Sequence, residues 1–411
     1  MSAGLRRSLA SLQVPNYRRW FIGMVISTTG TWMQTIAEGW LVLRLTGSGF
    51  ALGTAAALQF APMLLAGAWG GLLADRVPKR RLLVVTQTLM AIPALLLWGL
   101  TVSGAVTLWM VYALILVRGT VLAVDNPARQ AFVPELVGTD RLVNAVSLNS
   151  VLVQTARVAG PGLAAVVIAT VGVATCFGVN ALSFGAMLVV LARLDRSALL
   201  EAPVTARAPG QLREAASVVW RTPELRTPLA LMALVGTLAF NFATVFPLLA
   251  KFTFHGGAST YALLMSVMGA GAVLGALVNG ARGRVSPAIV AGSAFAFGAA
   301  LGAVALAPTL GFALVALPLV GAASVTFTAA VNTSLQLAVE PHLRGRVMAI
   351  YAVVFLGSTP IGGPLVGWLS QSAGPRAGLG VGAAAAVLAG LVGAVALRRS
   401  APAVLPARMG A

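Results

Sequence analysis

The chain has 411 residues, of which 58% are hydrophobic and only 9% are charged, and its mean hydropathy is +0.91. This composition excludes an ordinary soluble globular domain and indicates a protein that crosses a lipid bilayer several times. The net charge of +18 does not indicate nucleic acid as a partner, because the cations lie between apolar segments and form no basic face. With one cysteine, Cys176, and two histidines in expected loops, we expect no disulfide, metal site or cofactor.

Twelve apolar segments of about 20 residues run along the chain, which is the length that a helix needs to cross a bilayer. We expect membrane-spanning helices at 20–43, 50–70, 82–101, 107–126, 144–170, 173–193, 227–250, 259–280, 287–307, 309–335, 345–369 and 376–397. Residues 2–19 are short and polar, so no cleavable signal is expected there. The sequence therefore predicts an all-α membrane protein with twelve transmembrane helices.

The longest polar stretch, 194–226, divides these spans into two sets of six. It is rich in Arg, Glu and Pro, and its segment 211–221 has the pattern of a short amphipathic helix that lies on the membrane surface. We expect an N-terminal six-helix bundle at 1–193, a cytoplasmic linker over this stretch, and a C-terminal six-helix bundle at 227–411.

Most of the 28 Lys and Arg residues fall in the termini, the linker and every second loop between spans. The remaining loops carry only Arg44, Lys251 and Arg376. Because cations concentrate on the cytoplasmic side of membrane proteins, both termini are predicted to be cytoplasmic. We expect a multi-pass protein of a prokaryotic plasma membrane.

The segment 70–83, GGLLADRVPKRRLL, is a tight basic loop with one acid between two apolar spans. It resembles the signature loop of the major facilitator superfamily, with Pro78 where the family usually has glycine. The matching positions are Gly71, Leu73, Asp75, Arg76, Lys79 and Arg80. In that family an acid such as Asp125 pairs with this loop and closes an inner gate, so the resemblance implies a gating cluster here. The alternative is a basic loop of an unrelated multi-pass protein.

The two halves of the chain repeat. Two glycines and an arginine of the first half recur 204 residues later, at Gly67/Gly271, Gly71/Gly275 and Arg80/Arg284, and Asp75 is matched by Asn279 at the same displacement. Six helices separate the copies, so both have the same orientation across the membrane. This parallel duplication is the pattern that the family's two bundles show, related by a pseudo-two-fold axis.

The first expected helix carries a polar stripe, Ser27, Thr31, Gln34 and Glu38, at spacings of four, three and four residues. A charge inside a span is costly and indicates function by default. Glu38 has two interpretations: it binds and releases the coupling proton, or it pairs with an arginine and holds the bundle together.

Two arginines also fall inside spans. Arg118 resembles the helix-4 arginine of proton-driven facilitators. It either stabilises the ionised form of a nearby carboxylate, holds an anionic substrate or forms a structural salt bridge. Arg157 lies three residues after Gln154 and is followed by Gly160-Pro161, which resembles part of the helix-5 motif of exporters in the family. Glu38, Arg118 and Arg157 are our candidate proton-coupling residues.

In the second half the expected spans carry neutral polar residues at helical spacing. If helices 1, 4, 7 and 10 line a central cavity as in the family, the substrate would contact Thr31, Gln34, Glu38, Arg118, Gln154, Thr237, Phe240, Asn241, Thr328 and Asn332. Ordinary hydrogen bonding between helices is the alternative for each of the neutral ones.

Three segments, NYRRWF at 16–21, GTWMQTIAEGWLV at 30–42 and DNPARQAFVPELV at 125–137, resemble the branch of the superfamily that includes enterobactin exporters and drug-efflux proteins. The resemblance implies a monomeric exporter that exchanges a small organic molecule, a drug or a siderophore, for protons by alternating access. A nutrient importer or uniporter and a lipid or lysolipid transporter are the alternatives. An enzyme is disfavoured because no histidine lies inside a span.

Overall fold

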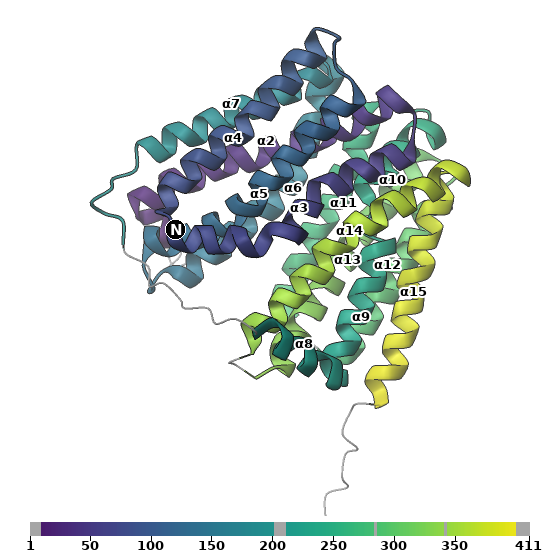
Figure 1. Cartoon of the computed structure of the whole chain (residues 1–411). Helices are drawn as coiled ribbons and strands as arrows, with labels where there is room; N and C mark the ends of the chain where they lie inside the picture. Colours follow the sequence, from purple (N-terminus) through teal and green to yellow (C-terminus); the bar gives the residue numbers. More distant parts are fainter. Residues whose placement is uncertain (1–9, 201–210, 283–285, 341–342, 400–411) are drawn as a thin grey trace, which may run out of the picture.

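The computed structural model describes residues 10–200, 211–282, 286–340 and 343–399, which form helices and connecting turns without any strand (Figure 1). A 3₁₀ turn, η1 (Ala10–Gln13), precedes the helices of the first half. These helices are α2 (Pro15–Thr46), α3 (Gly49–Arg76), α4 (Lys79–Val102), α5 (Leu108–Val137), α6 (Leu142–Thr170) and α7 (Val173–Ala192). The part of the expected linker at 201–210 lies outside the described residues.

The second half begins after the short helix α8 (Gln211–Arg221). Its helices are α9 (Pro223–Leu238), α10 (Phe242–Leu248), the π-helical turn η2 (Leu249–Thr253), α11 (Ala258–Arg282), α12 (Pro287–Ala305), α13 (Leu310–Ala338), α14 (Arg344–Ser372) and α15 (Pro375–Arg399). α8 packs against α9 and α14.

Within the described residues, eleven segments are long and apolar enough to cross a membrane, and α9, α10 and η2 form one of them together. The twelfth expected span is α2, which has 32 residues but falls outside this set. Its polar stripe lowers its hydropathy, and that stripe is buried among the neighbouring helices: Gln34 is fully buried and Glu38 is 3% exposed. The fold is thus the all-α membrane fold that the sequence predicts.

The seventh expected span, 227–250, is not one continuous helix. It is interrupted between α9 and α10, at residues 239–241. The side-chain amide of Asn241 donates to the carbonyl of Thr237 (2.7 Å), the acceptor that the backbone N–H of Asn241 would use in an unbroken helix. Pro247 lies inside α10 and has no N–H to donate. The side-chain bond of Asn241 therefore favours the break, whereas the missing donor of Pro247 concerns the carbonyl four residues earlier, inside α10.

The two halves meet along two helix pairs, α3 with α14 and α6 with α11. Close approach of α3 and α14 depends on glycines, because a Cβ at Gly53 would overlap the carbonyl oxygen of Gly363. Beside them, Ser48 donates to the side chain of Gln371 across the interface (2.7 Å). On the other pair, Ser266 of α11 donates to a backbone carbonyl of α6 (3.1 Å).

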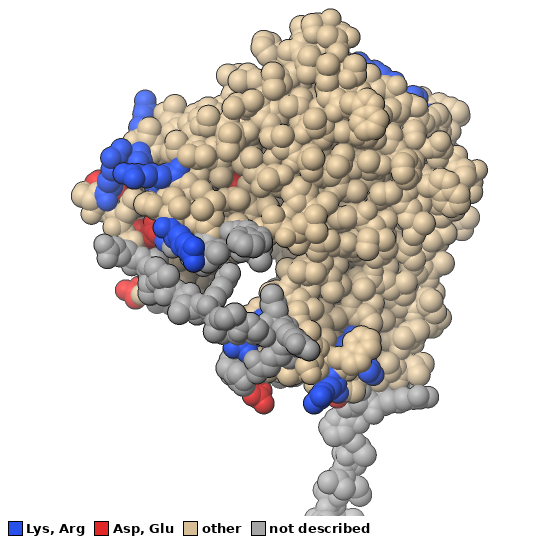
Figure 2. Space-filling model, in the orientation of Figure 1, with Lys and Arg blue, Asp and Glu red and all other residues tan. Residues whose placement is uncertain are grey.

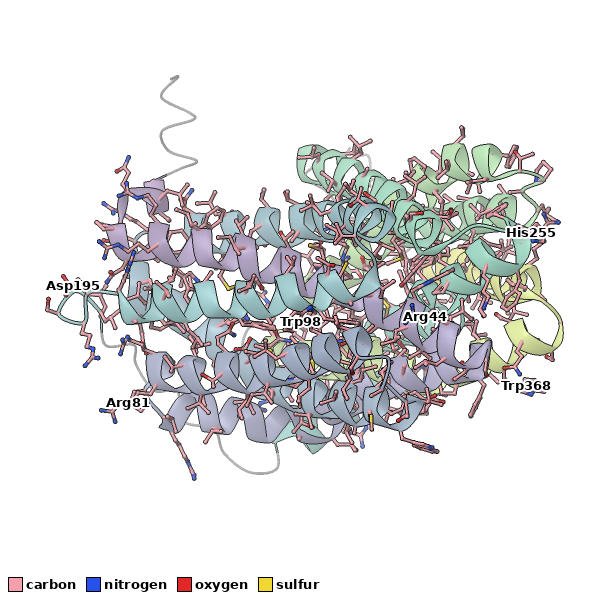
Figure 3. All side chains as sticks on the ribbon, turned by 90° about the horizontal axis from the view of Figure 1, so that it is seen from above. Arg44, Arg81, Trp98, Asp195, His255 and Trp368 are labelled. Carbon is pink, nitrogen blue, oxygen red and sulfur yellow. The ribbon has the colours of Figure 1, made fainter. Side chains whose placement is uncertain are left out.

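The two ends of the molecule differ in charge. Figure 3 shows Arg81 and Asp195 at one end and Arg44, His255 and Trp368 toward the other. We call the first the basic end, and Figure 2 shows blue Lys and Arg side chains gathered there on both halves. The surface between the halves is hollowed at this end (Figure 2), whereas the Ser48–Gln371 contact joins the halves at the opposite end.

Candidate functional site

A chain of buried polar side chains crosses the first half and ends at an ion pair. Glu38 of α2 accepts hydrogen bonds from Nη2 of Arg118 on α5 (2.5 Å) and from Nε2 of Gln34, one turn earlier (2.7 Å). Asn180 of α7 donates to Oε1 of Gln34 (2.6 Å), and Ser183 donates to Oδ1 of Asn180 (2.8 Å). The donors therefore line up so that the negative charge of Glu38 is stabilised from α5 and from its own helix.

Both members of the ion pair are buried, since Glu38 is 3% and Arg118 1% exposed. Removing one partner of such a pair leaves a buried charge without compensation and costs about 3–5 kcal/mol. Arg118 is also incompletely bonded: Nε and Nη1 are buried and have no hydrogen-bond partner within the described part of the chain. Glu38 is therefore the residue that compensates the charge of this guanidinium within the described part of the chain.

A small cavity of about 30 Å³ has Glu38 in its lining. It is enclosed by α2, α3, α5 and, from the second half, Ala243 of α10. Its polar lining comes from Glu38, Thr35 and Gln59. This volume suffices for a water molecule, and the lining offers the polar partners that a buried water needs. The acid therefore has a site for a hydrating water at the boundary between the two halves.

Arg157 does not pair with Glu38. Its guanidinium lies over the ring of Trp32, 5.2 Å from the centroid, and it has no carboxylate within ion-pair distance among the described residues. Its Nε is buried without a hydrogen-bond partner in the same part of the chain. α2 and α6 approach closely here, because Gly160 packs on the Cβ of Trp32. Gln154, on α6 with Arg157, is half-buried, and so is Thr31.

Asp125 has a different partner from the one that the sequence suggests. It is fully buried, forms an ion pair with Arg129 one turn later on α5, and accepts hydrogen bonds from Thr86 (2.6 Å) and Gln87 (2.9 Å) on α4. These contacts tie α5 to α4. The reason is local, because an acid and a base four residues apart on one helix lie on the same face.

The signature loop makes other contacts instead. Lys79 pairs with Glu135 at the end of α5 (3.3 Å), and Nε of Arg80 donates to a backbone carbonyl at the end of α7 (2.8 Å). Arg76 is exposed. Gly71 and Asp75 lie in the last turns of α3, and the side chain of Asp75 is outside the described part of the structure. The expected contact of Lys79 with Asp125 is therefore replaced by two separate ion pairs.

The candidate residues of the second half lie on α9, in the break between α9 and α10, and on α13. Asn241 is 4% exposed, and its Oδ1 has no hydrogen-bond partner among the described residues. Its amide is bonded to the carbonyl of Thr237. The ring of Phe240 stacks on Phe297 (centroids 5.2 Å apart) and meets Phe355 edge to face. Phe240 is thus part of an aromatic cluster between α12 and α14.

On α13, Thr328 and Asn332 are half-buried. The hydroxyl of Thr328 donates to a carbonyl of its own helix, and the oxygen of Asn332 accepts a hydrogen bond from Gln336 one turn later (2.6 Å). These hydrogen bonds run within α13 and not between helices, as the alternative supposed. A contact of Thr328 and Asn332 with a substrate stays a prediction.

Sequence reasoning missed several residues that the structure brings to these sites. Asn180 and Ser183 of α7 support Gln34, while Arg129 and Glu135 supply the ion pairs of the basic end. Asn180 is a polar amide in the middle of an apolar span, and that signal was available from the sequence. The sequence does not show which residue Asn180 contacts, because α2 and α7 are far apart in the chain.

Comparison with known proteins identifies the family. The family model described as "Transmembrane secretion effector" matches residues 6–404. The chain is 27% identical over 373 residues to the multidrug efflux pump Tap of Mycolicibacterium fortuitum, which covers 85% of this chain and 87% of that protein. It is 26% identical over 383 residues to the enterobactin exporter EntS of Citrobacter koseri, covering 92% and 91%. A shorter match to the staphyloferrin A transporter of Staphylococcus aureus, 26% over 250 residues, covers 61% of this chain and 63% of that protein.

Solved structures agree on the fold. The nucleoside transporter NupG matches with a TM-score of 0.75 at 12% identity, covering 93% of this chain and 98% of that chain. A bacterial homologue of the iron transporter ferroportin matches with a TM-score of 0.74 at 13% identity, again over 93% and 98%. These neighbours and the sequence relatives are membrane transporters, not enzymes. With a family model that spans almost the whole chain, the protein belongs to the transmembrane secretion effector family of the major facilitator superfamily.

Proposed function

We propose that this protein is a secondary active exporter that moves small organic molecules, of the drug or siderophore class, out of a prokaryotic cell in exchange for protons. The basic end faces the cytoplasm, which the distribution of Lys and Arg supports, and both termini lie there. The protein works as a monomer in the plasma membrane. Two relatives at about 26% identity are named as an efflux pump and as an exporter, which supports this direction.

The mechanism is alternating access between two bundles, 1–193 and 227–411, joined by the linker 194–226. The hollow at the basic end is the cytoplasmic entrance for the cargo (Figure 2). Contacts such as Ser48 with Gln371 close the opposite end. Rocking of the bundles about the α3–α14 and α6–α11 pairs would open that end and close the first. Lys79, Arg80 and Asp125, with the ion pairs described above, hold α4 and α5 in place when the cytoplasmic side moves.

One observation carries the proton coupling: the acid Glu38 is buried in an ion pair with Arg118 beside a water-sized cavity at the boundary between the bundles. A proton on Glu38 neutralises one member of the pair while Arg118 keeps its charge. The free energy of interaction between Glu38 and Arg118 therefore depends on whether Glu38 carries a proton. An acid in such a surrounding inside a membrane span is the residue that proton-driven transport needs.

The test measures efflux of a panel of drugs, dyes and siderophores from an efflux-deficient host, with and without a protonophore, and then in proteoliposomes with an imposed pH gradient. We expect Glu38→Gln to abolish the dependence of efflux on the gradient when efflux is normalised to the amount of folded protein in the membrane. Glu224→Gln is the matched control, because Glu224 is an exposed acid at the start of α9. Gradient-driven efflux by Glu38→Gln at the wild-type rate would remove Glu38 from this role.

Lipid transport remains the second candidate function, and one feature favours it. An apolar groove of about 670 Å³ lies on the side of the bundle between α3 and α5, with Leu58, Trp109 and Leu116 in its lining. Such a groove suits an acyl chain entering from the bilayer. Inhibition of dye efflux by added lysolipid would support this candidate. If lysolipid does not inhibit dye efflux, the proposal of an exporter of small organic molecules stands without it.

A further inference from the structure

Arg157 is a cation in the middle of a membrane-spanning helix, and nothing in the described part of the chain balances its charge. It lies near the centre of α6, and its guanidinium stacks on Trp32 of α2. Among the described residues it has no ion-pair partner, and its Nε is buried without a hydrogen bond. A charge inside a span is costly unless it is paired, and an aromatic ring replaces a counterion only in part. The mechanism proposed above does not use this residue.

The sequence holds no acid that is placed to serve as its counterion. The chain has ten Asp and Glu residues. Two of them, Glu38 and Asp125, lie inside spans, and both are already paired, with Arg118 and Arg129. The other eight lie in the last turns of helices, in loops or in the linker: Asp75, Glu135, Asp140, Asp195, Glu201, Glu214, Glu224 and Glu340. From the middle of a helix of 29 residues, either end is about 20 Å away. The middle of the first bundle therefore carries one positive charge in excess.

The stack on Trp32 leaves the edge of the guanidinium free. A ring contacts the face of the guanidinium, whereas the N–H groups point outward in its plane, the direction in which a carboxylate binds through two parallel hydrogen bonds. Of the three nitrogens of Arg157 only Nε is both buried and without a partner. Nη1 and Nη2 form no hydrogen bond within the described part of the chain and are therefore open to a ligand. Arginine keeps its proton at working pH, so this cationic edge is permanent.

Two more polar side chains share the face of α6 on which Arg157 lies. Gln154 precedes it by three residues and Ser150 by seven, spacings that bring side chains to one face of a helix. Ser150 is exposed, while Gln154 and Arg157 are half-buried. The exposure of this polar face therefore decreases from the basic end, where α6 begins, to the middle of the membrane.

The second bundle meets the first at the same depth. The carbonyl of Val158, next to Arg157, accepts the hydrogen bond from Ser266 of α11 (3.1 Å). A Cβ on Gly269, one turn further along α11, would lie 3.2 Å from the carbonyl oxygen of Arg157. Residues of α2, α6 and α11 thus surround Arg157. In transporters built from two repeats, the substrate site lies near the middle of the membrane at the interface between the repeats.

Resting on the proposed function, we propose that Arg157 is the binding site for cargo that carries a carboxylate or another oxyanion. The cargo enters through the hollow at the basic end (Figure 2) and passes Ser150. Its anionic group then accepts hydrogen bonds from Nη1 and Nη2 of Arg157 and from the side-chain amide of Gln154. Trp32 fixes the plane of the guanidinium. A neutral analogue of the cargo leaves the charge of Arg157 unbalanced, and a cationic one adds to the positive excess, so the protein selects anions.

Anionic lipid headgroups offer the same oxyanion chemistry as such a cargo. They lie at the surface of the bilayer, however, whereas Arg157 lies near the middle of α6. Its position therefore favours a molecule that reaches the interior of the protein.

The test measures binding and needs no transport. 1-Naphthoate, an aromatic carboxylate, and 1-naphthamide, a neutral molecule of nearly the same shape, are titrated into the purified full-length protein in nonionic detergent, and the heat of binding is recorded. We expect naphthoate to bind about tenfold more tightly than naphthamide, and Arg157→Gln to lower the affinity for naphthoate about tenfold. Arg157→Lys keeps the charge without the planar edge and should lose less. The affinity for naphthamide should be the same in all three proteins.

Arg44→Gln is the matched control. Arg44 is an exposed arginine in the last turn of α2, and its removal changes the net charge by the same amount. Its affinity for naphthoate should equal that of the parent. No preference of the parent for naphthoate, or an equal loss of affinity in Arg44→Gln, would overturn the anion site.

Phosphatidylglycerol added to the micelles separates the two sources of the oxyanion. We expect it to leave naphthoate binding unchanged, and displacement of naphthoate would overturn the assignment to cargo. Absence of efflux of every compound in the panel described above would overturn the proposed function, whereas the binding measurements decide the anion site by themselves.

Discussion

The ion pair between Glu38 and Arg118 is expected to contribute strongly to stability, and a double-mutant cycle measures how much. The perturbations are Glu38→Gln, Arg118→Gln and the two together. Two unit charges about 4 Å apart interact by about 4 kcal/mol at an effective dielectric constant of about 20. This agrees with the loss of about 3–5 kcal/mol when a buried pair loses one partner. Both side chains are nearly fully buried, so solvent screening takes little from this value.

Each single variant leaves one buried charge unpaired, whereas the double variant leaves none. We therefore expect each single substitution to lower the free energy of unfolding by about 3–5 kcal/mol, and the double substitution to lower it by less than the sum of the two. The measurement is equilibrium unfolding of the purified protein in mixed detergent micelles. Additivity of the two single effects to within about 0.5 kcal/mol would refute the pairing and the mechanism that depends on it.

Two further predictions concern residues outside this pair. Gly53→Val should prevent α3 from approaching Gly363 of α14. Cross-linking between these helices at the end opposite to the basic end should then fall, and efflux should fall with it. Gly99→Val should change neither, because a Cβ at that position meets open space. Arg157→Gln should change the free energy of unfolding by less than about 1 kcal/mol, because it removes a cation stacked on Trp32 and no ion pair. A loss as large as that expected for Arg118→Gln would contradict the absence of an ion pair at Arg157.

Crossing a bilayer is a property of each segment by itself, and the sequence alone therefore determined the spans. Apolar length and the distribution of cations predicted twelve helices. The first of them, 20–43, was predicted by its apolar length, although its polar stripe takes α2 out of the apolar set in the structure. Charges inside spans singled out Glu38, Arg118 and Arg157, because a charge is rare there without a reason.

Only the tertiary structure decided which of these charges meet. Glu38 pairs with Arg118 and not with Arg157. Asp125 pairs within its own helix. Ala243 of α10 lines the same cavity as Glu38 from the other bundle, more than 200 residues later in the chain. The physical reason is that helical spacing defines the face on which a side chain lies, whereas the rotation and depth of a helix among its neighbours depend on packing along its whole length. That packing requires contacts between residues far apart in the chain.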